Sequence, residues 1–106
     1  MLQNSLLKNY KQKPNHTAVV YNGSKYTYAD LWISVIKMAC WLDKNVVSKA
    51  RIGILLDNSY EAVILIYGIV MSNRVCIPLD TDMHEKNIKY IVDDASISLV
   101  ITSFKY

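Results

Sequence analysis

The sequence predicts an α/β fold: an open, mostly parallel, doubly wound sheet with an N-terminal helix and a β-hairpin. Three short apolar runs, at 51–56, 75–79 and 98–102, lack polar alternation, which is typical of strands covered on both faces. Segments with helical periodicity alternate with these runs. Strand–helix–strand units in succession imply right-handed crossovers and parallel strands.

The first two predicted elements are a helix and a hairpin. An amphipathic helix begins at Leu2, places three leucines near one face, and is ended by Pro14. Two β-rich runs follow in TAVVYNGSKYTY, residues 17–28, and meet at Asn22-Gly23. This dipeptide tolerates the positive φ values of a tight turn, so we expect a β-hairpin beside the parallel sheet.

Three further helices are each predicted to begin at an oxygen-bearing side chain that is followed three places later by a carboxylate. Such a side chain accepts a hydrogen bond from the first helical turn, and the carboxylate reaches back to the cap amide. The three pairs are Thr27 with Asp30, Asn58 with Glu61, and Asp82 with Glu85.

The apolar faces of these helices predict how deeply each one is buried. The first has a single apolar stripe that runs from Tyr28 to Leu42. The second, Ser59 to Ser72, is apolar nearly all round, so we expect it to be buried on more than one side. The third should point its apolar residues inward, namely Ile88, Ile91, Val92 and Ala95.

Composition and charge limit the class of protein. The chain has 106 residues, of which 52% are hydrophobic, so we expect one domain spanning 1–106. Its net charge of +3 comes from scattered basic residues, which does not suit a nucleic-acid surface. The longest apolar run, 62–71, is too short to span a membrane. Cys40 and Cys76 lie in apolar segments and are expected to be buried free thiols, as in a cytoplasmic protein.

The stretch CIPLDTDMHEKN, residues 76–87, is the densest group of titratable side chains. Asp80, Asp82, His84 and Glu85 could form a metal site or an acid/base pair, or they could be the polar link between a strand and a helix. Helix capping accounts for Asp82 and Glu85, Asp80 can brace the turn, and His84 would occupy the second helical position, pointing toward solvent or a neighbouring loop. We therefore predict no catalytic, cofactor-binding or metal-binding residue here.

Other catalytic patterns are absent from the sequence. There is no G-x-S-x-G motif, and Gly23, Gly53 and Gly68 are isolated, so there is no glycine-rich phosphate loop. The residues alone therefore identify an α/β domain without a visible active site.

Five segments resemble the AMP-forming adenylate-forming enzymes, which include acyl-CoA synthetases, nonribosomal peptide adenylation domains and D-alanine–carrier protein ligases. YTYADL at 26–31 and GIVMSNRVCIPLD at 68–80 look like the first two core motifs of that family. NHTAVVYNGSKYTY at 15–28, RIGILLDNSYEAVILIYGIV at 51–70 and HEKNIKYIVDDASISLVIT at 84–102 are similar to segments around them. The resemblance covers nearly the whole chain, in order.

The resemblance implies an N-terminal piece of a larger lobe in an ATP-dependent, carboxylate-activating ligase. ATP and Mg²⁺ serve the family, but its phosphate loop, which ends in Pro-Lys-Gly, does not occur in this sequence. The chain alone is therefore expected to bind no cofactor and to be inactive. Its implied partner is the remainder of the enzyme, or a second copy, through the sheet edge at 97–102 and the helix at 62–71. Carrier protein or CoA would be met only by the full enzyme.

Some positions depart from the family pattern. Asn45 and Lys49 stand where glycine is common, and Asn73 replaces a glycine at a helix end. Because asparagine tolerates the left-handed conformation, Asn45 and Asn73 are expected to adopt it.

Two other functions are compatible with part of these observations. The first is a free-standing, non-catalytic interaction module derived from the same family. The second is an unrelated nucleotide-binding domain, which would require a glycine-rich strand-to-helix turn. The turns at 57–59 and 80–82 lack glycine and carry acid, so the sequence disfavours the second alternative.

Overall fold

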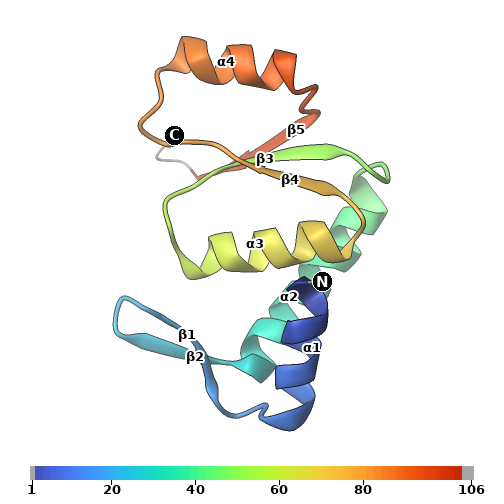
Figure 1. The fold of residues 1–106 in the computed structure, drawn as a ribbon, viewed down its shortest axis with the longest axis vertical. Helices are drawn as coiled ribbons and strands as arrows, with labels where there is room; N and C mark the ends of the chain where they lie inside the picture. The colour runs from blue at the N-terminus through green and yellow to red at the C-terminus, as the bar shows by residue number, and fades with distance from the viewer. Residues whose placement is uncertain (1, 104–106) are drawn as a thin grey trace.

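The structure, a computed structural model, describes residues 2–103. Helices and strands alternate much as the sequence predicts, and each parallel strand lies within one residue of its predicted range (Figure 1). The elements are, in order, α1 (Leu2–Gln12), β1 (Thr17–Tyr21), β2 (Ser24–Thr27), α2 (Tyr28–Asn45), β3 (Arg51–Leu55), α3 (Tyr60–Met71), β4 (Val75–Pro78), α4 (Glu85–Asp94) and β5 (Leu99–Thr102).

The hairpin of β1 and β2 forms a two-stranded antiparallel sheet of its own. Its turn residues Asn22 and Gly23 have φ values of 51° and 78°, which is the geometry expected of a turn with positive φ at both central positions. The next helix, α2, begins with the predicted capping box. Thr27 Oγ1 accepts from the Asp30 amide at 3.1 Å, and Asp30 Oδ2 accepts from the Thr27 amide at 2.9 Å.

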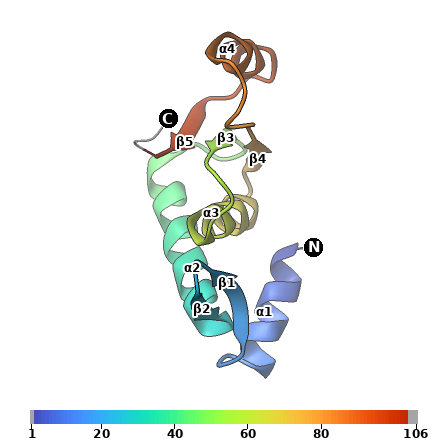
Figure 2. The ribbon, with the colours of Figure 1, turned by 90° about the vertical axis from the view of Figure 1, so that its left-hand side faces the viewer.

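The remaining strands form a parallel sheet in the order β4-β3-β5. Helix α3 follows β3 and lies on one face of the sheet, whereas α4 follows β4 and lies on the opposite face (Figures 1 and 2). This arrangement confirms the prediction of a doubly wound sheet, because consecutive crossovers run in opposite directions along it.

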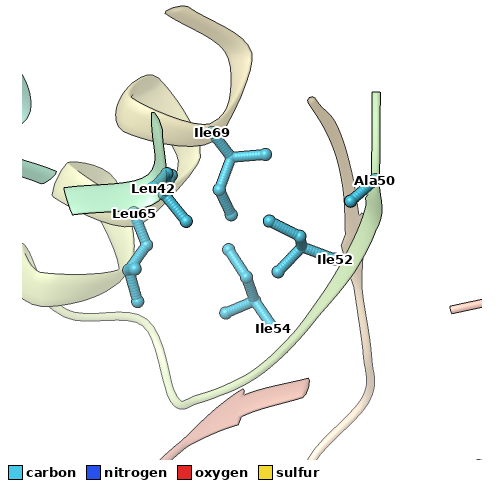
Figure 3. Packing of buried hydrophobic residues seen from close by; sticks show 6 residues of the cluster. All are labelled: Leu42, Ala50, Ile52, Ile54, Leu65 and Ile69. Atoms are coloured by element: carbon cyan, nitrogen blue, oxygen red, sulfur yellow. The ribbon is translucent and has the colours of Figure 1, made fainter. Parts of the chain in front are cut away.

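The main core lies between the sheet, α2 and α3. Figure 3 shows Ile52 and Ile54 of β3 pointing toward Leu65 and Ile69 of α3, with Leu42 of α2 beside them, and all five are buried. The two helices approach closely at Gly68. A Cβ atom there would lie 2.7 Å from Met38 Cγ, so glycine is required for this packing.

Two further clusters extend the core. Leu6, Leu31, Val35 and Tyr60 join α1 and the hairpin to α2 and α3, so α3 is buried on more than one side, as predicted. On the other face of the sheet, a cluster around Leu79 packs under α4. The inward-facing residues of α4 are the four predicted ones, Ile88, Ile91, Val92 and Ala95, although none of them is fully buried.

Arg74, just before β4, connects the C-terminal ends of two helices. It is only 7% exposed, and its guanidinium donates hydrogen bonds to Val46 O at the end of α2 and to Ser72 O at the end of α3. It also pairs with Asp43 Oδ1 at 2.7 Å, but the Asp43 side chain is 64% exposed. Two backbone carbonyls, one buried and one partly buried, therefore hold Arg74 more than the ion pair does, because solvent screens an exposed carboxylate.

Each strand of the parallel sheet is preceded by a non-glycine residue in the left-handed conformation. Lys49, Asn73 and Ser96 have φ values of 63°, 62° and 55°. The expectation for Asn73 is thus confirmed, whereas that for Asn45 is wrong. Asn45 stays helical and its Nδ2 donates to Trp41 O at 2.8 Å, so the left-handed turn falls later, at Lys49.

Replacing Arg74 by alanine is expected to lower the free energy of unfolding by about 2–3 kcal/mol, because a buried and a partly buried carbonyl lose their charged donor. Equilibrium denaturation with urea measures the change. The matched control is Asp43→Asn, which should cost less than about 1 kcal/mol, as expected for an exposed pair. Equal losses for the two variants would contradict the interpretation that the carbonyls hold Arg74.

Replacing Lys49 by glycine is expected to raise the free energy of unfolding by about 0.5–1 kcal/mol. Relief of the left-handed conformation, about 1–2 kcal/mol, exceeds the added entropy of glycine in the unfolded chain. The same change at Lys37, an exposed residue in the middle of α2, should instead destabilise the protein by about 1 kcal/mol. The two variants are compared by thermal and urea unfolding, and destabilisation by both would show that Lys49 is not strained.

Candidate functional site

The carboxyl ends of β3 and β4 are the place where this fold would hold a ligand. The two strands are neighbours, and the helices that follow them lie on opposite faces of the sheet (Figure 2). Open α/β sheets bind ligands in the crevice at such a switch point. The loops that line it are 56–59, after β3, and 79–84, after β4.

Polar side chains connect these two loops to each other and to their own backbone. Thr81 Oγ1 donates to Asp57 Oδ1 at 3.2 Å, from one loop to the other. Asp80 Oδ1 accepts from the Asp82 amide at 2.9 Å, and the Met83 amide donates to Asp80 O at 3.1 Å. The expected bracing role of Asp80 is confirmed, since its carboxylate closes a tight turn directly after the strand.

The N-terminus of α3 is capped one residue later than predicted. Ser59 is the cap, and its Oγ accepts from the Ala62 amide at 3.1 Å. The prediction that Asn58 caps this helix is therefore wrong. Asn58 and Ser59 are both suitable cap residues. The backbone of Ser59 is extended (φ −163°, ψ 169°), so the helix starts at the next residue, Tyr60.

The N-terminus of α4 is capped by His84, not by Asp82 as predicted. The helix begins at Glu85, and His84 Nδ1 accepts from the Lys86 amide at 3.2 Å. His84 is therefore the cap and not the second helical residue, whereas its exposure to solvent agrees with the prediction. Asp82 belongs to the turn that precedes the helix, because its amide donates to the Asp80 carboxylate, and α4 begins only at Glu85.

The electrostatics of this edge are acidic. The segments 55–61 and 79–85 contain Asp57, Glu61, Asp80, Asp82 and Glu85 but no lysine or arginine. Carboxylates beside a helix N-terminus disfavour a phosphate, because they place like charges together. Within residues 2–103, no three histidine, cysteine or acidic side chains are grouped so that they could hold a metal ion. The described arrangement orders loops and caps helices.

The two thiols differ from each other. Cys40 is exposed on α2, so the prediction that both cysteines are buried is wrong for it; the exposed face of α2 is more apolar than a single inward stripe implies. Cys76 is half-buried on β4, and burial raises the pKa of its thiol. Its thiolate, the nucleophilic form, is thus disfavoured at neutral pH.

Tyr60, at the start of α3, is the most buried phenol in the described region. Its ring stacks on Tyr26 of the hairpin with centroids 3.7 Å apart and planes inclined by 11°. Burial raises the pKa of the Tyr60 hydroxyl, so it stays protonated at neutral pH. The pair fastens the hairpin to α3 and offers no nucleophile.

Beside α1 lies a cavity with a mainly apolar lining. It measures about 420 Å³ and lies between α1, the hairpin, α2 and α3. Its lining includes Leu6, Val19, Leu31, Val63 and Ile66, with Ser5 and Asn9 as polar members. This lining carries no acid, base or thiol, so it offers packing but no reactive group.

The sequence patterns did not predict the Thr81–Asp57 bond or the cap at His84. The bond joins residues 24 positions apart, and it follows only once β3 and β4 are known to be neighbours. His84 and Asp82 can both accept a hydrogen bond from a first-turn amide, and only the folded chain shows that His84 is the one that directly precedes α4.

Comparison with known proteins gives the same family throughout. The profile of the AMP-binding enzyme family matches residues 6–106. The chain is 31% identical to bacitracin synthase 2 of Bacillus licheniformis over 93 residues, which cover 86% of this chain and 4% of the synthase. It is 28% identical to the long-chain-fatty-acid–CoA ligase of Bacillus subtilis (strain 168) over 102 residues, covering 95% of this chain and 18% of the ligase.

The fold is also that of a solved relative. The unliganded O-succinylbenzoate coenzyme A synthetase of Bacillus subtilis superposes with a TM-score of 0.91 at 22% identity, over 97% of this chain and 23% of the synthetase. The chain thus spans less than a quarter of the length of each of these relatives. No helix among residues 2–103 is long and apolar enough to cross a membrane. The profile match over nearly the whole sequence shows that the chain belongs to the AMP-binding enzyme family.

Proposed function

We propose that these residues form the N-terminal part of an ATP-dependent ligase that activates an amino acid or another carboxylate as its adenylate. The reaction joins the carboxylate to the α-phosphate of ATP and releases pyrophosphate. One observation carries the proposal: a family match over residues 6–106, in a chain that spans 4% and 18% of two ligase-type relatives. As part of a single domain in the large lobe, this segment would act in the cytoplasm.

The role proposed for this part is structural. Its crevice loops carry carboxylates that are used in turns and caps, and the sequence has no glycine-rich phosphate loop. ATP and Mg²⁺ would bind to residues of the remaining enzyme, which is the proposed partner of this chain. A solved complex of the Bacillus subtilis synthetase contains both ATP and a magnesium ion. A carrier protein or CoA would accept the acyl group only from the complete enzyme.

The proposal is tested on the natural polypeptide that carries this sequence. Its intact mass is measured in the source cells, and the purified protein is assayed for carboxylate-dependent exchange of pyrophosphate into ATP. We expect a species several times heavier than 12.1 kDa that shows exchange. A heavy species without exchange for any amino acid or fatty acid, or a species of 12.1 kDa alone, would favour a non-catalytic interaction module.

The 106-residue chain by itself is expected not to bind ATP. Millimolar ATP with Mg²⁺ should leave its midpoint of thermal unfolding unchanged, because ligand binding to the native state would raise it. The complete enzyme should show a rise under the same conditions. A saturable rise with the short chain, absent when tripolyphosphate replaces ATP, would show that this segment contains part of the nucleotide site.

A further inference from the structure

We draw no further inference here: the strongest candidate, the open groove between the β1–β2 hairpin and the N-termini of α2 and α3, lined by Lys25, Ser34 and Tyr60 among others, carries nothing, because the buried hydroxyl of Tyr60 is closed off from it and nothing in the structure shows what covers the groove.

Discussion

The hydrogen bonds of the Arg74 guanidinium are the interaction on which the arrangement of α2, α3 and the sheet depends. A buried cation is costly unless its protons are satisfied. Here the cation lies at the C-termini of two helices, where both macrodipoles favour positive charge, and its two terminal nitrogens donate to a carbonyl of each, whereas its buried Nε–H has no partner among the described residues. Because Arg74 directly precedes β4, this contact also fixes where that strand starts relative to both helices. Two backbone hydrogen bonds nearby then align β3 with β4: the Lys49 amide donates to Asn73 O, and the Val75 amide donates to Ala50 O.

The two ends of the sheet are built by different means, and the difference bears on function. At the amino ends, left-handed residues make tight turns, which order the chain but present little chemistry. Doubly wound sheets bind ligands at the carboxyl ends of their strands. Here the side chains of Asp80, Ser59 and His84 accept hydrogen bonds from backbone amides two or three residues later. Ser59 and His84 each satisfy one amide of a helix N-terminus, and the carboxylates of Glu61 and Glu85 in the first turns disfavour an anion there. In an adenylating enzyme this segment would therefore hold the position of the sheet, while other segments bind ATP.

The sequence predicted the fold well wherever the pattern was local. Asn22-Gly23 and the Thr27–Asp30 box act over three residues or fewer, and both have the expected geometry. The caps of α3 and α4 were misplaced because neighbouring side chains compete, Asn58 with Ser59 and Asp82 with His84. Tertiary packing decides which of them precedes the helix. Arg74 was not singled out at all, since its partners lie 28 and 31 residues away and meet only in the folded chain.

The two edges of the parallel sheet bear on how the proposed ligase would be completed. The outer edge of β4 carries Pro78, which has no amide proton, whereas β5 contains no proline and no charge. In a complete ligase the remaining polypeptide would have to cover the β5 side, because a bare apolar edge invites aggregation. The half-buried Leu99, Val100 and Ile101 are therefore the side chains that the larger lobe would bury.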